Sequence, residues 1–280
     1  MLTIIIPGKT EKYFKKTIEE VLEKATGEIE IYACTDGYSE PLEDRVNDPR
    51  VHYINTEPST GNQKRHLINM AVAQCKGEYV MTLDAHCIVG EGFDEILIRD
   101  HQPNWVQIPR RLRLDAENWK VEEDDRLPVD YEYPMWQAWK KGQLKSFRWE
   151  ARTKERMDIP IDETMAFQGS CYFLTKDYYN KLGLMQTEGY GGFAQESEEI
   201  VCKVWADGGK VMTNKNTFYA HLHKGKKHGR MYDLNWEEVK DSIDYSFNFF
   251  VNEHRDIYLK KIPQFMPIPN WSEDWQKYLK

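Results

Sequence analysis

The sequence of 280 residues has few cysteines, no internal repeat and no long apolar run. Its five cysteines are odd in number and scattered, and no Cys-x-x-Cys pair occurs, so neither a zinc knuckle nor a disulfide framework is expected. The apolar opening, Leu2–Ile6, is far too short to span a bilayer, and no signal-peptide pattern precedes it. These absences predict a protein of a reducing compartment with no membrane segment, and we expect a cytoplasmic location.

The charge balance argues against a general polyanion-binding protein, because the formal net charge is −8. Positive charge is nevertheless concentrated in two places, at Arg110, Arg111 and Arg113 and in the run Lys224–Arg230. A basic loop on an acidic protein suggests a local phosphate site, although a solvated loop explains the run equally well. The sixteen Tyr and nine Trp are more than a core requires, so some should line a groove that binds rings, sugars or bases.

Strand and helix patterns alternate over the first hundred residues. Strands are predicted at Leu2–Ile6, Glu28–Cys34, Val51–Ile54 and Glu78–Leu83. Helical spacing of apolar residues lies between the first two strands and between the last two. This alternation predicts an α/β fold with a Rossmann-like, mostly parallel sheet and helices on both faces. Ligands bind such sheets at the carboxyl ends of the strands, where Pro7, Asp36 and Asp84 follow three of them.

The sequence Asp84-Ala85-His86 stands at the end of the fourth predicted strand. Residues i and i+2 of a strand point to the same face, so Asp84 and His86 can bind one object together. A carboxylate with an imidazole suits a divalent cation such as manganese or magnesium. Alone, so short a motif is more often a strand-end turn.

The regular alternation is lost over residues 101–165, which we interpret as an irregular insertion above the site. Trp136, Trp139 and Trp149 in this segment are candidates for stacking on an acceptor, whereas Trp205 is expected in the core. Order returns with a strand at Cys171–Leu174, helices at Asp177–Leu182 and Ser197–Ala206, short strands at Lys210–Thr213 and Thr217–Ala220, and a last helix capped by Asn235 with Glu238. We expect a catalytic domain over residues 1–230, with residues 231–280 packed on it as a helix and a Pro- and Trp-containing tail.

As an ordered set, these motifs resemble the nucleotide-sugar glycosyltransferases of the GT-A fold, and within them family 2. The matching segments are Ile4–Pro7, Asp36-Gly37, Lys76–Val80 and Leu83-Asp84. The details are most similar to the catalytic domain of the polypeptide N-acetylgalactosaminyltransferases, whose metal motif is Asp-x-His followed by Cys. Further matches in that family's order are Met165-Ala166, Gly169, Leu182-Gly183, Glu196, Glu199-Ile200, Trp205, Gly208-Gly209 and His221, which stands twelve residues after the paired glycines.

The resemblance implies a metal-dependent transfer from a nucleotide-sugar, with a UDP-sugar as donor and Mn²⁺ or Mg²⁺ as cofactor. Asp84, His86 and His221 would bind the metal, and His223 is the rival third ligand. Asp36 would accept the imide N–H of a uracil ring. The remaining donor-binding candidates are Pro7, Arg65, Gly169 and Lys224, with Lys224 and Lys226 expected on a loop that closes over the diphosphate.

Glu196 resembles the acidic residue that holds the donor sugar or faces the acceptor, and we predict that it and Asp84 are catalytic. Inverting relatives carry an acid at the next position as the base, but Ser197 stands there in this chain. Glu198 and Glu199 follow, and Glu199 is expected to be structural. Retention of the anomeric configuration is therefore predicted; with inversion, Glu196 or Glu198 would have to act as the base.

The family's lectin domain and membrane anchor do not occur in this sequence, and Phe193-Ala194-Gln195-Glu196 replaces a Trp-Gly-Gly-Glu element. These differences suggest a bacterial or viral relative, acting in the host cytoplasm if viral. Its acceptor could be a protein, a polysaccharide or a hydroxymethylated base of viral DNA. Two alternatives remain at this point: a nucleotidyltransferase, and a non-catalytic carbohydrate- or nucleic-acid-binding protein. The sequence predicts no oligomeric state.

Overall fold

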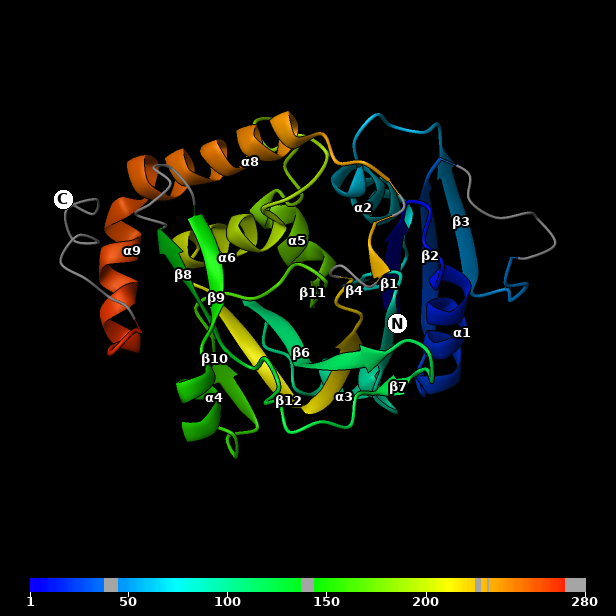
Figure 1. Ribbon diagram of the computed structural model, residues 1–280, viewed down its shortest axis with the longest axis horizontal. Helices are drawn as coiled ribbons and strands as arrows, with labels where there is room; N and C mark the ends of the chain where they lie inside the picture. The colour runs from blue at the N-terminus through cyan, green and yellow to red at the C-terminus, as the bar shows by residue number, and fades with distance from the viewer. Residues whose placement is uncertain (38–44, 137–143, 225–227, 231, 270–280) are drawn as a thin grey trace.

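The computed structural model describes residues 1–37, 45–136, 144–224, 228–230 and 232–269. The first four strands form a parallel sheet in the order β3-β2-β1-β4 (Figure 1). The bounds are β1 Leu2–Gly8, β2 Ile29–Asp36, β3 Val51–Thr56 and β4 Tyr79–Leu83. β1 and β2 are buried along almost their whole length, as expected for strands covered on both faces. The predicted α/β class is confirmed.

The sheet continues beyond β4 with a change of direction. β11 (Cys171–Thr175) runs antiparallel between β4 and β6 (Trp105–Asp115), and β12 (Lys210–His221) is parallel to β6. The short strands are β5 Cys87–Val89, β7 Lys120–Val121 and β10 Ile161–Glu163. β12 replaces the two short strands predicted there, and its register with β6 shifts between Asn214 and Phe218. The long β12 brings His221 beside Cys87, directly after the Asp84-Ala85-His86 motif.

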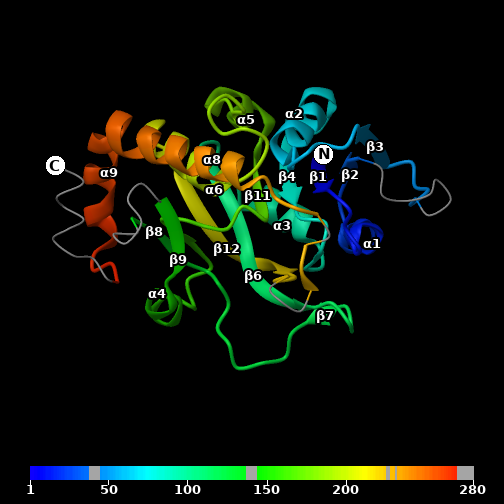
Figure 2. The same ribbon diagram turned by 45° about the horizontal axis from the view of Figure 1, so that its top comes forward.

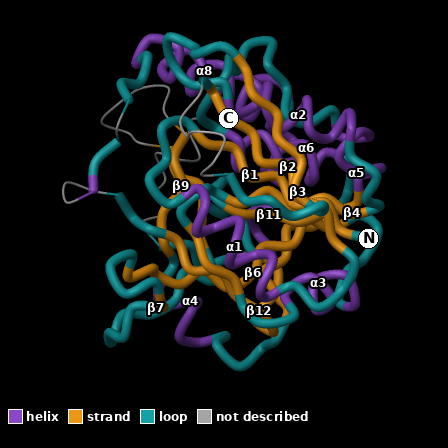
Figure 3. The backbone as a smooth tube through the Cα atoms, turned by 90° about the vertical axis from the view of Figure 1, so that its right-hand side faces the viewer, coloured by secondary structure: helices purple, strands orange, loops and turns teal. Residues whose placement is uncertain are grey.

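Helices cover both faces of the sheet (Figure 3). On one face lie α1 (Phe14–Lys24) and α3 (Phe93–Arg99), which are joined because Asp94 accepts hydrogen bonds from the backbone at Thr26 and Gly27. On the other lie α2 (Lys64–Gln74), α5 (Lys176–Leu182) and α6 (Glu196–Ala206). Gly183 ends α5 in the left-handed region, with φ of 60°.

The interpretation of residues 101–165 as an irregular insertion is wrong for a large part of that segment. Its first strand, β6, belongs to the central sheet, and β8 (Glu132–Trp136) pairs with β9 (Leu144–Arg148) as a separate hairpin, followed by α4 (Glu150–Glu155). Trp149 is buried, with its ring centroid 5.6 Å from that of Tyr133. It is therefore a core residue, not a stacking platform; Trp139 and the side chain of Trp136 lie outside the described residues.

The carboxyl-terminal segment packs on the sheet domain and shares its hydrophobic core (Figure 2). It consists of α8 (Trp236–Asn248), a π-helical turn (Phe249–Glu253), α9 (Arg255–Lys261) and a 3-10 turn (Ile262–Phe265). Asn235 caps α8 as predicted, accepting from the backbone of Glu237 and Glu238. The expected core residue Trp205 is buried against Tyr258, with ring centroids 5.1 Å apart. Within the described ranges, no helix combines the length and apolar character needed to cross a bilayer.

Candidate active site

A cavity of about 660 Å³ opens where β1, β4 and β12 end, within the size range of small-molecule sites. Seven residues predicted from the sequence line it: Pro7, Asp84, His86, Gly169, Glu196, His221 and Lys224. The parallel strands bring these groups together from segments more than two hundred residues apart. The cavity thus lies at the strand ends, where the sequence predicts the ligand site.

Asp84, His86 and His221 form a three-residue cluster within this cavity. Nε2 of His221 lies 3.3 Å from Oδ2 of Asp84 and 3.1 Å from Nε2 of His86. All three residues offer a ligand atom within 4.8 Å of the others. His223, the rival ligand, lies beyond the end of β12, is exposed, and does not belong to the cluster.

The protonation states of Asp84 and His221 suit metal binding. Burial lowers the pKa of His221 to about 3, although Asp84 acts in the opposite direction, so the imidazole is neutral at ordinary pH. Burial would raise the pKa of Asp84, but Lys64 and His221 outweigh it and hold that pKa far below its usual value. A neutral imidazole and an ionised carboxylate are the forms that bind a metal. This set of oxygen and nitrogen donors fits a divalent cation such as Mn²⁺.

Two lysines and an acid complete the surroundings of the cluster. Nζ of Lys64 lies 2.8 Å from Oδ1 of Asp84 and 2.9 Å from the carbonyl oxygen of Gly169. The carboxylate of Glu11 lies 3.3 Å from Nδ1 of His86 and accepts two hydrogen bonds from Lys224, at 2.6 and 2.8 Å. Glu11 therefore connects the histidine of the cluster to the lysine at the start of the basic loop.

Neither Lys64 nor Glu11 was expected from the sequence. A signal for Lys64 exists, because α2 begins with Lys64 and Arg65 and has no acid in its first turn. Positive charge is disfavoured at the amino end of a helix, so two cations there indicate that their side chains interact with groups outside the helix. Glu11 stands in the loop before α1, where an acidic residue carries no comparable signal.

Lys226 lies outside the described residues, as do its neighbours Gly225 and Lys227.

Glu196 begins α6 and faces the cavity. It is 7% exposed, its Oε1 has no hydrogen-bond partner among the described residues, and Nζ of Lys64 lies 4.0 Å away. Ser197 turns instead to Glu198, to which its hydroxyl donates at 2.7 Å. Glu198 is buried, does not line the cavity, and has a raised pKa because of burial. Of these acids only Glu196 is placed to reach a ligand.

Asp36, the predicted partner of a uracil ring, is covered by its own neighbours. Its two oxygens accept hydrogen bonds from the backbone and side chains of Ser59 and Gln63, and Nζ of Lys9 lies 3.2 Å from Oδ2. Asp36 is 3% exposed and is not among the described residues that line the cavity. The uracil contact stays a prediction, and it would require these bonds to open.

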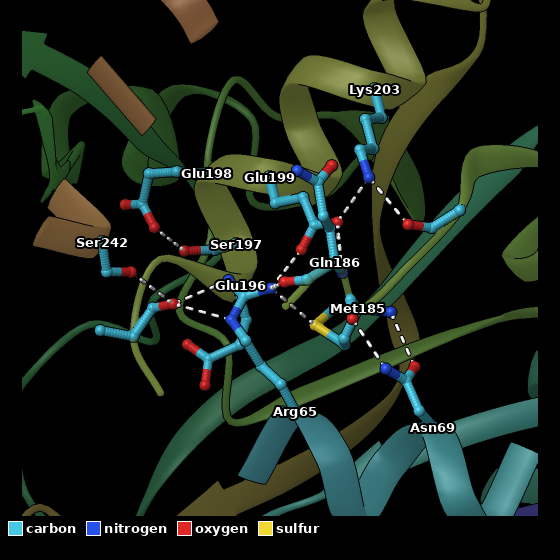
Figure 4. Close-up of polar contacts among 12 residues, drawn as sticks. Arg65, Asn69, Met185, Gln186, Glu196, Ser197, Glu198, Glu199, Lys203 and Ser242 are labelled. Carbon is cyan, nitrogen blue, oxygen red and sulfur yellow. Dashed lines mark hydrogen bonds and ion pairs between the residues drawn. The ribbon is translucent and has the colours of Figure 1, made fainter. Parts of the chain in front are cut away.

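Arg65 requires a correction, because it does not reach the cavity. Its side chain is fully buried and forms an ion pair with Glu199, while its guanidinium also donates to the carbonyl oxygen of Ala194 (Figure 4). Glu199 accepts further hydrogen bonds from the backbone of Gln186 and from Lys203. Arg65 therefore fastens α2 to α6 instead of contacting phosphate or ribose, and Glu199 is structural, as expected.

The fold is that of the GT-A class of glycosyltransferases. The family model described as "Glycosyl transferase family 2" matches residues 3–183, and the chain belongs to that family. A curated relative, the putative polypeptide N-acetylgalactosaminyltransferase 13 of Drosophila melanogaster, is 26% identical over 148 residues. That match covers 51% of this chain and 25% of the relative.

Solved structures agree with the fold. The crystal structure of GalNAc-T7 with UDP, GalNAc and Mn²⁺ matches 99% of this chain and 54% of its own, with a TM-score of 0.69 and 15% identity. S. aureus TarS 1-349 in complex with UDP-GlcNAc matches 99% of this chain and 70% of its own, with a TM-score of 0.55 and 10% identity. At these identities the likeness concerns the fold. The chain spans only about a quarter of the curated relative and about half of GalNAc-T7.

Proposed function

We propose that this protein is a metal-dependent glycosyltransferase that moves a sugar from a nucleotide-sugar, most simply a UDP-sugar, to a hydroxyl acceptor with retention. The observation that carries the proposal is the convergence of Asp84, His86 and His221 in a cavity large enough for a nucleotide-sugar. Family membership supports it. So do the similar structures, one with UDP and Mn²⁺ and one with UDP-GlcNAc.

The cluster, the two lysines and Glu196 would each have a different role in the transfer. When bound by the three-residue cluster, Mn²⁺ or Mg²⁺ supplies positive charge that stabilises the departing diphosphate. Lys64 and Lys224 line the same cavity and can donate to phosphate oxygens there. Glu196 has a free carboxylate oxygen that can accept a hydrogen bond from a hydroxyl of the donor sugar. These roles make the assignments of Glu196, Asp84 and Lys224 from the sequence more specific.

Retention is proposed because the residues next to Glu196 offer no base to the cavity. Ser197 is not acidic, and Glu198 is held by Ser197 and by Ser146, whose hydroxyl donates to it at 3.1 Å. Analysis of the product's anomeric configuration tests this point. An inverted product would contradict retention and would assign the base to Glu196 or to Asp233, an exposed acid at the cavity rim.

The first experiment measures UDP released from a panel of UDP-sugars in the presence of Mn²⁺, with and without EDTA. We expect one donor to be turned over only with metal, and Asp84→Asn and His221→Gln to lose that turnover and the calorimetric signal of Mn²⁺ binding. His66→Gln, which removes an exposed histidine of α2, is the matched control and should behave as wild type. Absence of both turnover and Mn²⁺ binding in the wild type would exclude the proposal.

A further inference from the structure

A second cavity, of about 590 Å³, adjoins the first and is rich in arginine. We call it the arginine cavity; the guanidinium groups that line it belong to Arg111, Arg113, Arg126 and Arg148. The first cavity, which contains the Asp84, His86 and His221 cluster, is called the donor cavity from here on. The arginine cavity shares Gln168, His221, His223 and Lys224 with it, so the two cavities meet at His221, a predicted metal ligand. A molecule in the arginine cavity therefore lies beside the place where the sugar would be transferred.

Strand alternation separates the arginines of β6 into two functions. Arg110 points to one face, where it forms a two-pronged ion pair with buried Asp130, at 3.0 and 2.8 Å. Arg111 and Arg113, two residues apart, point to the opposite face and line the arginine cavity. The cluster recognised in the sequence thus contains one structural arginine and two that face an open space.

The acids around the arginine cavity leave part of its positive charge unneutralised. Glu122 is paired with Arg126, and Asp115 accepts hydrogen bonds from its own turn, from the backbone of Glu117 and Asn118. Glu132 lies 3.8 Å from Arg111. Three of the four described acids that line this cavity are thereby largely occupied, and none of these three forms a close ion pair with Arg113 or Arg148.

Arg113 and Arg148 are those two remaining cations. Arg113 donates to the carbonyl oxygen of Leu127 at 3.2 Å. The side chain of Arg148 forms no hydrogen bond or close ion pair with the described residues, although Glu132 and Glu150 attract it. Burial, and then the like charge of Arg148 and Arg126, lowers the pKa of Arg113. Several guanidinium groups facing one space, with few carboxylates free to neutralise them, form a ready site for an anion.

We propose that the arginine cavity binds a phosphate group of the acceptor, next to the hydroxyl that receives the sugar. Phosphate is favoured over a single carboxylate because its oxygens can accept from several planar guanidinium groups at once. The inference rests on the proposed function, since it assigns the acceptor of that same transferase. It selects phosphate-bearing acceptors among the classes left open above, and a phosphodiester of nucleic acid and a small phosphorylated sugar share this chemistry.

The test measures binding without metal or donor, so that its outcome does not depend on turnover. Ribose 5-phosphate, ribose and a short single-stranded oligodeoxynucleotide are titrated by calorimetry in the presence of EDTA. We expect the phosphate-bearing probes to bind, ribose not to bind, and the double variant Arg113→Gln/Arg148→Gln to lose roughly tenfold in affinity for each arginine removed. Arg99→Gln, which removes an exposed arginine of α3, is the matched control and should bind as wild type.

The outcomes distinguish between the two sources of the phosphate, and they decide whether the proposal holds. Tighter binding of the oligonucleotide, weakening with added salt, identifies a polymeric phosphodiester. Equal or tighter binding of ribose 5-phosphate identifies a small phosphorylated acceptor. Phosphate probes that bind no better than ribose, or a double variant that binds them like wild type, would overturn the proposal. Metal-dependent UDP release would still stand in that case, so the two failures are distinguishable.

Discussion

The ammonium of Lys64 lies 2.8 Å from Oδ1 of Asp84, and the lysine is almost entirely enclosed. A fixed positive charge from the first turn of α2 thus already lies beside Asp84, a predicted metal ligand. That charge favours the ionised form of Asp84, but it would also repel a cation bound to the same carboxylate. Lys64 therefore has opposite effects on the metal and on an anionic diphosphate.

Replacing Lys64 with methionine should separate these effects. We expect Lys64→Met to bind Mn²⁺ more tightly in the absence of nucleotide, on the order of tenfold, because the repulsion between the two cations is removed. Its affinity for UDP at saturating Mn²⁺ should fall by about tenfold or more, because a charge-assisted hydrogen bond to phosphate is lost. Calorimetric titration of each ligand measures both changes.

Lys181→Met is the control, since Lys181 is an exposed lysine paired with Asp207 at the surface. It should leave both affinities unchanged. Weaker Mn²⁺ binding in Lys64→Met would contradict the argument and would show that the lysine mainly keeps Asp84 in position.

Glu11 is expected to orient His86 for the metal. A carboxylate that holds the second ring nitrogen of a metal-binding histidine fixes its tautomer and its direction. Glu11→Gln should therefore weaken Mn²⁺ binding by roughly 10- to 100-fold, the usual effect of losing such a partner. The manganese signal in electron paramagnetic resonance reports the free ion directly. Glu23→Gln, which changes a largely exposed acid of α1, should have no effect; an equal loss in both variants would mean that only overall charge matters.

The sequence predicted the fold well, because buried strands and helices follow local patterns, and it named the three residues that the structure brings together, Asp84, His86 and His221. The buried strands near Ile5 and Met81 and the Asp84-Ala85-His86 motif are visible without a structure, and His221 was found through family spacing. The role of Arg65 was mistaken, because a cation near a phosphate site and a cation bridging two helices look alike in sequence. Only tertiary packing places Glu199 against it. The contact of Glu11 with His86 likewise joins residues 75 positions apart in the sequence, and no local pattern specifies it.

The Arg65–Glu199 ion pair is expected to be important for stability. Both side chains are fully buried, so removal of Arg65 takes the nearest cation from the interior carboxylate of Glu199 and leaves Lys203 beside it. Arg65→Met should lower the free energy of unfolding by about 3–5 kcal/mol. The double variant Arg65→Met/Glu199→Gln should be less destabilised than the sum of its single changes, because the stranded charge is gone. Urea unfolding measures all three variants.

The exposed ion pair of Arg99 with Asp100 supplies the comparison for this cycle. Arg99→Gln should change the free energy of unfolding by no more than about 1 kcal/mol, as is usual for surface pairs. Strictly additive effects at Arg65 and Glu199 would show that the two residues are not energetically coupled.

His101 gives a prediction for acid stability far from the candidate site. Burial lowers its pKa from 6.5 to about 4, and its ring lies edge-on to Tyr79 and Phe173, with Nδ1 3.0 Å from the side-chain amide of Gln107. Between pH 6.5 and 4 the unfolded chain binds a proton at this residue that the folded protein does not. Stability at this site is therefore complete above about pH 6.5 and is lost as the pH falls toward 4.

Replacing His101 with phenylalanine removes this proton uptake and keeps an aromatic ring against Tyr79 and Phe173. We expect the free energy of unfolding of His101→Phe to depend less steeply on pH over that interval, by up to one bound proton, with little change in dependence above pH 7. Urea unfolding at a series of pH values measures the slope. His66→Gln removes an exposed histidine of α2 and should keep the wild-type slope. A wild-type slope in His101→Phe would mean that the ring is already protonated in the folded protein, which its neutral, acceptor role toward Gln107 argues against.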